Sequence, residues 1–283
     1  MHYGELKVED GVFVPKTEIE YSLDNPFQRV VKVDGPVAED DKLVFDENYP
    51  YLDNSFKAKW NWFLGWFFLW GPVMWVNRLH FGYRVKGKEV LKKYKAALKD
   101  GALAVCNHVY AFDAICVTRA LRPLRRLRIP MLQDHFNGNK RWMLVNLGGV
   151  PLPHDMSGLK EFNNAFDEYH RRKDWMLVFP EAVRWNNYKP IRPFRKGAFT
   201  MAYRYGIPVV PCVINFRPRK GIYRLFGSKD TPCYDITICE PIVPDTSAPR
   251  RSEVDRLRVE AHARMEKAAG ILVNPWPSVP SDE

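Results

Sequence analysis

The feature that most constrains the fold is an alternation of short apolar runs and longer amphipathic segments, which begins near Val85. Each short run has the length of a buried strand, and each longer segment repeats apolar residues every three or four positions, as on one face of a helix. Strands that alternate with helices predict an α/β fold with a mostly parallel sheet flanked by helices. The runs interpreted as strands are Ala102–Cys106, Arg128–Leu132, Trp175–Phe179, Pro208–Ile214 and Cys233–Cys239.

Three of the longer segments carry helix signals. Ser157 can accept the first free backbone N–H groups of a helix. The apolar face of that helix comprises Leu159, Phe162, Phe166 and Tyr169. A second helix is predicted over Lys196–Tyr205 and should end at Gly206. A third begins near Ser252, and its apolar stripe extends to Leu272.

Residues 60–76 form the most apolar stretch of the chain. Trp62, Trp66 and Trp70 recur every four residues, so they share one helical face, and tryptophan favours the membrane interface. The run is shorter than the roughly 20 apolar residues that a spanning helix needs, and Pro72 interrupts it. We therefore predict an interfacial helix motif over residues 57–82, which lies in one leaflet. A buried helix of a soluble core is the alternative.

Charge is distributed unevenly along the chain. Residues 1–56 hold 5 Lys and Arg against 13 Asp and Glu, which leaves 38 against 20 in the remainder. A body this basic predicts an anionic partner. Five arginines between Arg119 and Arg128 favour the same conclusion. We expect an anionic phospholipid surface and no nucleic acid, because the sequence has no signature of a nucleic-acid-binding module.

Five cysteines occur in the chain, an odd number without metal-ligand spacing. They predict a reducing, cytosolic environment with neither a disulfide framework nor a metal site. Cys106, two residues before His108, is a possible nucleophile by position, but packing in the core is the favoured interpretation. The sequence also lacks the Gly-x-Ser-x-Gly elbow of serine hydrolases.

His108 follows directly after the strand predicted to end at Cys106, and Asp113 stands five residues further on. Open α/β sheets bind their ligands at the carboxyl ends of the strands. Asp113 falls in the first turn of the following helix and can fold back toward the imidazole. A carboxylate on one ring nitrogen leaves the other nitrogen free as a general base. The pair is therefore suited to deprotonating an alcohol.

Further blocks follow the His-x4-Asp motif in order. They are Phe-Pro-Glu-Ala-Val-Arg at 179–184, Phe-Arg-Lys-Gly-Ala at 194–198 and Ile-Pro-Val-Val-Pro at 207–211. In this combination, residues 78–218 resemble the glycerolipid (lysophospholipid) acyltransferase family. The resemblance implies that His108 is the base acting on the acceptor hydroxyl and that Asp113 orients it.

The same resemblance implies an acceptor site. Glu181 and Arg184 match the positions that contact the acceptor in the family, and Arg184 suits a phosphate because guanidinium binds phosphate oxygens bidentately. Lys196 and Gly197 match a block that supports this site. A solvated surface charge is the alternative for Lys196.

The chain departs from the family pattern at several positions. Ala182 and Val183 replace Gly and Thr. His154 stands where an acceptor-binding Arg is expected, and Met131 and Leu132 stand where a Lys is usual. Protonated His154 could substitute weakly. These changes put a phosphomonoester acceptor in question but leave the acyl-transfer chemistry intact.

The resemblance implies transfer of a fatty acyl group from acyl-CoA or acyl carrier protein to a lysophospholipid hydroxyl, in the first place 1-acylglycerol-3-phosphate, without cofactor or metal. Another lipid acceptor and a catalytically silent lipid-binding relative are the alternatives. The expected location is peripheral, on the cytoplasmic face of the cell membrane. The expected organisation is an acidic arm (1–56), the membrane motif (57–82), an acyltransferase domain (83–273) and a tail (274–283).

Overall fold

The computed structural model describes residues 21–22, 24–29, 43–121, 127–136, 141–227 and 231–280. The acidic arm predicted over residues 1–56 therefore lies largely outside the described residues, as do three of the five arginines between Arg119 and Arg128.

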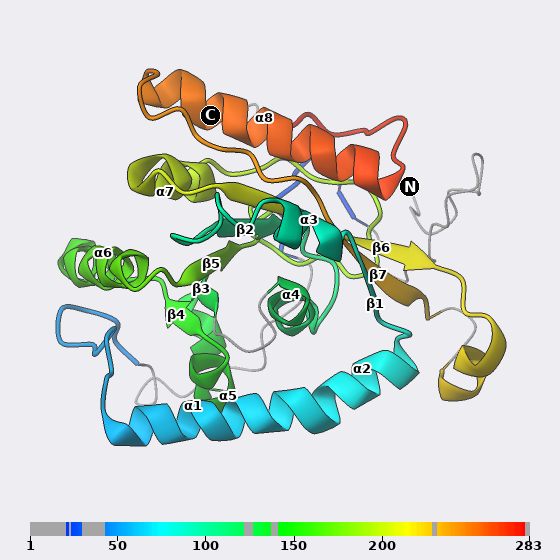
Figure 1. Ribbon diagram of the computed structural model, residues 1–283, viewed down its shortest axis with the longest axis horizontal. Coiled ribbons are helices and arrows are strands. Elements are labelled where there is room, and N and C mark those ends of the chain that lie inside the picture. Colours follow the sequence, from blue (N-terminus) through cyan, green and yellow to red (C-terminus); the bar gives the residue numbers. More distant parts are fainter. Residues whose placement is uncertain are drawn as a thin grey trace.

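The described strands form one seven-stranded sheet in the order β1-β7-β6-β2-β5-β3-β4 (Figure 1). They are β1 (Arg84–Lys86), β2 (Leu103–Cys106), β3 (Leu127–Met131), β4 (Gly149–Pro151), β5 (Trp175–Val178), β6 (Val209–Arg217) and β7 (Cys233–Ile238). Neighbours are parallel except β6 and β7, which run antiparallel. The predicted mostly parallel α/β sheet is confirmed. The edge strands β1 and β4 were not predicted, because three residues are too few to show a period.

The central strands are buried on both faces, which is why they read as continuous apolar runs. Leu103 and Val105 of β2 face one core, and the alternating Ala104 and Cys106 face the other. Helices α6 (Met156–Arg171), α7 (Gly197–Tyr205) and α8 (Arg250–Ala269) cover the first face. Helices α3 (Lys88–Lys93) and α4 (Asp113–Leu121) cover the second.

Helix ends partly follow the sequence signals. Asp155, and not Ser157, caps α6: its Oδ1 accepts from the Gly158 N–H at 2.9 Å. Gly206 ends α7 in the left-handed conformation, as predicted. Leu272 lies beyond the end of α8 and is 77% exposed, so the last helix is shorter than its apolar stripe suggested.

The aromatic segment forms helices along the lower edge of the molecule in Figure 1. Helix α1 (Phe56–Phe68) leads through a π-helical turn, η3 (Leu69–Val73), into α2 (Met74–His80). Pro72 lies within η3. A proline has no N–H for the helical hydrogen bonds, and the chain forms a π-helical turn here, which is wider than an α-helical turn. Among the described residues, no helix combines the length and the apolar character needed to cross a bilayer. Short helices η4 (Gln133–Phe136), α5 (Arg141–Asn146) and η5 (Gly221–Phe226) complete the described elements.

Candidate active site

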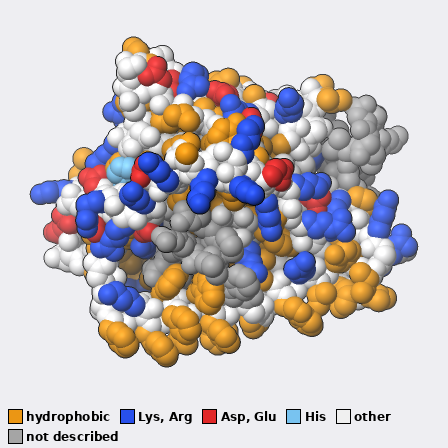
Figure 2. All heavy atoms as spheres, viewed as in Figure 1, with side chains coloured by type: hydrophobic (Ala, Val, Ile, Leu, Met, Phe, Trp, Pro, Cys, Tyr) orange, Lys and Arg blue, Asp and Glu red, His pale blue; other side chains and the backbone are white. Residues whose placement is uncertain are grey.

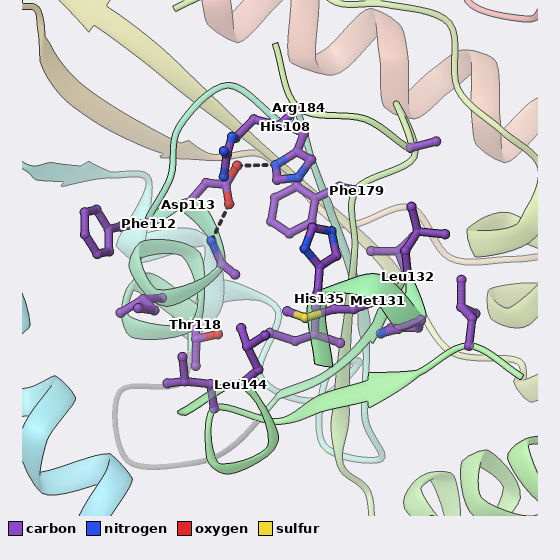
Figure 3. Close-up of a pocket in the computed structure, with 18 of the residues that line it drawn as sticks. His108, Phe112, Asp113, Thr118, Met131, Leu132, His135, Leu144, Phe179 and Arg184 are labelled. Atoms are coloured by element: carbon purple, nitrogen blue, oxygen red, sulfur yellow. Dashed lines mark hydrogen bonds and ion pairs between the residues drawn. The ribbon is translucent and has the colours of Figure 1, made fainter. Parts of the chain in front are cut away.

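Two elements bring the predicted catalytic pair together. His108 lies just beyond the carboxyl end of β2, and Asp113 is the first residue of α4. Oδ2 of Asp113 lies 2.5 Å from Nδ1 of His108 (Figure 3). The Asp113 side chain is 3% exposed, whereas that of His108 is 22% exposed. The carboxylate therefore occupies Nδ1 and leaves Nε2 as the ring nitrogen available to a substrate.

His108 is held on its ring and on both sides of its backbone. The imidazole stacks on Phe179, with the ring centroids 4.4 Å apart. The His108 N–H donates to Oε2 of Glu181 at 2.9 Å, and the His108 carbonyl accepts from the Trp185 N–H at 2.9 Å. The geometry of the pair is therefore set before any substrate arrives, as effective catalytic sites require.

Asn107 anchors the turn that carries His108. Its Oδ1 accepts from the Ile214 N–H at 2.8 Å, and its Nδ2 donates to the Ile214 carbonyl at 3.1 Å. The side chain thus continues the pairing of β2 with β6 one residue after β2 ends. Sequence reasoning did not single out Asn107. The available signal was an Asn directly after an apolar strand, because an amide side chain buried there needs hydrogen-bond partners.

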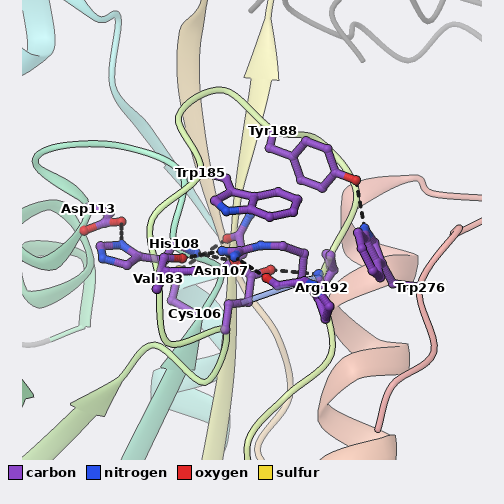
Figure 4. Close-up of polar contacts among 12 residues, drawn as sticks. Cys106, Asn107, His108, Asp113, Val183, Trp185, Tyr188, Arg192 and Trp276 are labelled. Atoms are coloured by element: carbon purple, nitrogen blue, oxygen red, sulfur yellow. Dashed lines mark hydrogen bonds and ion pairs between the residues drawn. The ribbon is translucent and has the colours of Figure 1, made fainter. Parts of the chain in front are cut away.

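Glu181 was expected to contact the acceptor, and the structure places it in the protein interior. Glu181 and Arg192 are both fully buried, and Nη2 of Arg192 lies 2.8 Å from Oε2 of Glu181. Figure 4 shows Arg192 in the interior, between Trp185 and Trp276. The Arg192 N–H donates to Oε1 of Glu181 at 2.9 Å. Burial lowers the pKa of Arg192, and the adjacent Glu181 offsets part of that effect. Glu181 therefore supports His108 from behind and does not line the cavity.

The Glu181–Arg192 pair lies under aromatic side chains from distant parts of the chain. The Arg192 guanidinium lies 4.4 Å from the centre of the Trp185 ring, and Tyr21 stacks on the same ring at 4.6 Å. Trp276 donates from Nε1 to the Tyr188 hydroxyl at 2.8 Å. Residues near both ends of the chain thus exclude water from the pair, which sequence reasoning did not predict.

A mainly apolar cavity of about 530 Å³ opens beside His108, within the roughly 300–1,000 Å³ range of small-molecule sites. Its walls come from α1, α4, α5 and the carboxyl end of the sheet (Figure 3). Apolar lining residues include Trp62, Trp66, Ile115, Leu144 and Val178. The cavity thus places an apolar volume directly against the catalytic pair.

Arg184 brings a cation to this cavity. Its Nε is buried and has no hydrogen-bond partner among the described residues. A buried N–H without a partner is costly, so this position suits an anionic group of a substrate. Ala182 adopts a φ of +63°, the left-handed conformation that favours glycine. This backbone geometry explains why glycine is usual at this position in the family.

The structure separates the other predicted acceptor residues. Gly197 lines the cavity at the start of α7. Lys196 precedes it, is exposed, and does not line the cavity. His154 is also outside the cavity, and its Nδ1 contacts Oε1 of Gln133. Arg184 and Gly197 are therefore brought to the site, and Lys196 and His154 are not.

A second histidine, His135 of η4, also lines the cavity. Figure 3 shows its ring next to that of Phe179. Burial lowers the pKa of His135, and the positive charge of Arg29 lowers it further. His135 thus supplies a neutral imidazole to the wall at neutral pH. Sequence reasoning missed this residue because nothing in the local pattern ties η4 to the turn after β2.

Cys106 lies in the core and does not line the cavity. Cys106 is fully buried, and burial raises the pKa of its thiol well above the ordinary value, so it stays protonated within the core. Among the described residues, no group of three or more His, Cys, Asp and Glu side chains could hold a metal ion.

Comparisons with known proteins agree with the fold and with the family resemblance. A family model described as Acyltransferase matches residues 82–215. A 1-acyl-sn-glycerol-3-phosphate acyltransferase of Salmonella typhimurium is 24% identical over 191 residues, 66% of this chain and 73% of the relative. An uncharacterised acyltransferase of Schizosaccharomyces pombe is 24% identical over 146 residues, 48% of each chain.

Among solved structures, the 1-acyl-sn-glycerophosphate (LPA) acyltransferase PlsC of Thermotoga maritima matches with a TM-score of 0.50. The match covers 78% of this chain and 85% of that one at 18% identity, and it supports the same fold. The resemblance that the motifs indicated is confirmed: residues 82–215 match the acyltransferase family model, and the relatives that match this chain are named acyltransferases.

Proposed function

We propose that this chain transfers a fatty acyl group from an acyl thioester to a hydroxyl of a lysophospholipid at a membrane surface. The observation that carries the proposal is the His108–Asp113 pair, with Nδ1 occupied at 2.5 Å and the ring at the wall of an apolar cavity. A hydroxyl on an amphipathic lipid can reach Nε2 while its acyl chain occupies the apolar part of the cavity.

In the proposed reaction, Nε2 of His108 removes the hydroxyl proton as the acceptor oxygen forms a bond to the thioester carbonyl carbon. The tetrahedral intermediate then collapses, the carbon–sulfur bond breaks, and the imidazolium returns the proton to the departing thiolate. Asp113 stabilises the imidazolium through Nδ1. General-base assistance of this kind typically contributes about 10²–10⁴-fold. Backbone N–H groups near the start of α4 are the candidates for stabilising the oxyanion.

The favoured acceptor is 1-acylglycerol-3-phosphate, which would give phosphatidate. Two Salmonella relatives carry this activity in their names, and Arg184 offers an unpartnered buried Nε at the cavity wall. Another lipid acceptor is the second candidate. It is favoured by the position of His154, outside the cavity and in contact with Gln133, where the family has a phosphate-directed Arg.

The proposed membrane surface is the outer side of α1 and α2. Apolar side chains follow the lower edge of the molecule in Figure 2, where Figure 1 places these helices. The exposed large apolar residues on α1 are Phe56, Trp60, Phe63, Phe67 and Phe68. Trp62 and Trp66 of the same helix line the cavity. One helix would therefore contact lipid on its outer side and form the acyl-binding wall on its inner side.

We further propose that the protein binds the cytoplasmic face of the membrane, where acyl-CoA or acyl carrier protein is the donor. Five free thiols support a reducing environment. The proposed division of the chain remains an arm (1–56), the membrane motif (57–82), the catalytic domain (83–273) and a tail (274–283).

The decisive experiment is an assay of labelled acyl-CoA and acyl carrier protein against a panel of lysolipids that includes 1-acylglycerol-3-phosphate. We expect acyl transfer by the native chain and its loss, by about 10²-fold or more, in His108→Ala and Asp113→Asn. Circular dichroism should show unchanged folding in both variants.

Lys196→Gln is the matched control, because its side chain is exposed beside the site and does not line the cavity. Release of free fatty acid without an acceptor would indicate a hydrolase. Binding of lysolipid with no turnover, unaffected by His108→Ala, would indicate a silent lipid-binding relative. Retained transfer in His108→Ala would refute the assignment of the base.

A further inference from the structure

The connection between β6 and β7 presents large apolar side chains to solvent. Its short helix η5 contains no buried residue. Ile222 is 62% exposed, Leu225 is 81% exposed and Phe226 is 37% exposed. Three large apolar side chains within five residues are costly to leave in water, so their exposure requires an explanation.

Hydrogen bonds hold the exposed connection in a defined conformation. Arg219 is 5% exposed, and its guanidinium donates to the Tyr223 carbonyl at 2.7 Å and to the Thr231 carbonyl at 3.0 Å. Gly227 approaches so closely that a Cβ there would lie 2.9 Å from Cζ of Arg219. A buried arginine thus ties both sides of the turn together. The apolar side chains are held outward by the fold.

The exposed apolar surface of η5 continues that of α2. Helix η5 packs against α2, and Figure 1 shows the two elements at the same lower right corner of the molecule. On α2, Trp75 is 69% exposed and Val76 is 48% exposed. Figure 2 shows apolar side chains along this lower edge and at its right end.

The charge of the connection complements an anionic surface. From Arg217 to Gly227 the sequence contains four basic residues and no acidic residue. Lys220 and Arg224 are exposed next to the apolar side chains. Basic residues that flank an exposed apolar face are typical of segments that bind anionic lipid headgroups while their apolar side chains enter the acyl region.

We infer that η5 is a second bilayer contact, which inserts Ile222 and Leu225 into the same leaflet as α1 and α2 and places Lys220 and Arg224 on anionic headgroups. The inference rests on the membrane association proposed above. A contact on α1 alone leaves the molecule free to rock about that helix. A second contact beyond α2 fixes the orientation of the sheet, and with it the cavity, relative to the bilayer.

The test is co-sedimentation of the full chain with vesicles of phosphatidylcholine, with and without phosphatidylglycerol. Leu225→Glu should lower the vesicle partition coefficient by about tenfold or more, because burial of one leucine accounts for at least that factor. The matched control is Leu272→Glu. Leu272 is 77% exposed and lies beyond the end of α8, on the other face of the sheet, so this variant should bind vesicles like the native chain. Lys220→Gln with Arg224→Gln should weaken binding only to the anionic vesicles, by roughly fivefold per charge.

The outcomes separate this inference from the proposed function. In one outcome the native chain binds vesicles, with binding reduced in Phe63→Glu on α1 and unchanged in Leu225→Glu. That outcome would keep the membrane proposal and overturn the role of η5. Absence of binding by the native chain would overturn both. An equal loss in Leu272→Glu, or a change in self-association of Leu225→Glu with unchanged vesicle binding, would also overturn the role of η5.

Discussion

Removal of the Arg192 guanidinium should destabilise the protein strongly, because it would leave a carboxylate buried without its counter-ion. Glu181 and Arg192 are 0% exposed, and their side chains meet at 2.8 Å. In Arg192→Met the Glu181 carboxylate keeps two N–H donors, from His108 and from residue 192, but loses the charged partner. Breaking a buried ion pair on one side costs about 3–5 kcal/mol.

This cost converts into a measurable shift of the unfolding midpoint. Large domains lose roughly 2–4 °C of Tm per kcal/mol, so Arg192→Met should lower the Tm by about 6–20 °C. The double variant Glu181→Gln, Arg192→Met buries no charge, and it should unfold at a higher temperature than Arg192→Met alone. Differential scanning calorimetry of the detergent-solubilised full chain would measure both.

The matched control for the buried pair is an exposed one. Arg171 pairs with Glu168 at 2.6 Å on the surface of α6, and Arg171→Met should leave the Tm nearly unchanged because exposed ion pairs contribute little. The reasoning would be refuted if Arg192→Met unfolded within 2 °C or so of the native chain, a shift smaller than any buried ion pair predicts. It would equally be refuted if the double variant were less stable than Arg192→Met.

Two further predictions concern the Phe-Pro-Glu block. Arg184→Ala should raise the KM for a phosphate-bearing acceptor by roughly tenfold or more, because hydrogen bonds to charged groups contribute about 1.5–3 kcal/mol. The KM for the thioester should not change. Equal effects on both substrates in steady-state kinetics would contradict a phosphate role. Ala182→Gly should stabilise the chain by up to about 1 kcal/mol. Relief of the left-handed backbone gains about 1–2 kcal/mol, but the greater conformational entropy of glycine in the unfolded chain offsets part of that gain. Urea unfolding showing a less stable glycine variant would contradict the strain at φ +63°.

Patterns within short stretches identified most of the sheet and the central pair. Apolar runs between amphipathic segments predicted β2, β3, β5, β6 and β7, because a strand buried on both faces has no polar side to interrupt it. The approach of His108 to Asp113 was foreseeable for a related reason. The two residues lie five positions apart at the junction of a strand and a helix, so local geometry brings them together.

Contacts between distant segments were decided by the tertiary structure alone. The Glu181–Arg192 pair, the Asn107–Ile214 bonds and the entry of His135 into the cavity depend on strand order and on how loops meet at the sheet edge. A residue type and its neighbours along the chain do not specify that order. Glu181 shows the difference: its motif marked it as functional, but only the fold shows that its carboxylate supports His108 from the buried side.

The sequence by itself determined the α/β class, the acyltransferase motifs and the apolar character of residues 60–76, because each is a property of composition and spacing over a few turns or strands. The tertiary structure decided which cations reach the cavity, which side of α1 faces outward, and that η5 continues the apolar edge of α2. Exposure is a relation between a side chain and everything packed around it. Leu225 and Leu257 are both leucines, yet Leu225 is 81% exposed and Leu257, on the inner face of α8, is fully buried.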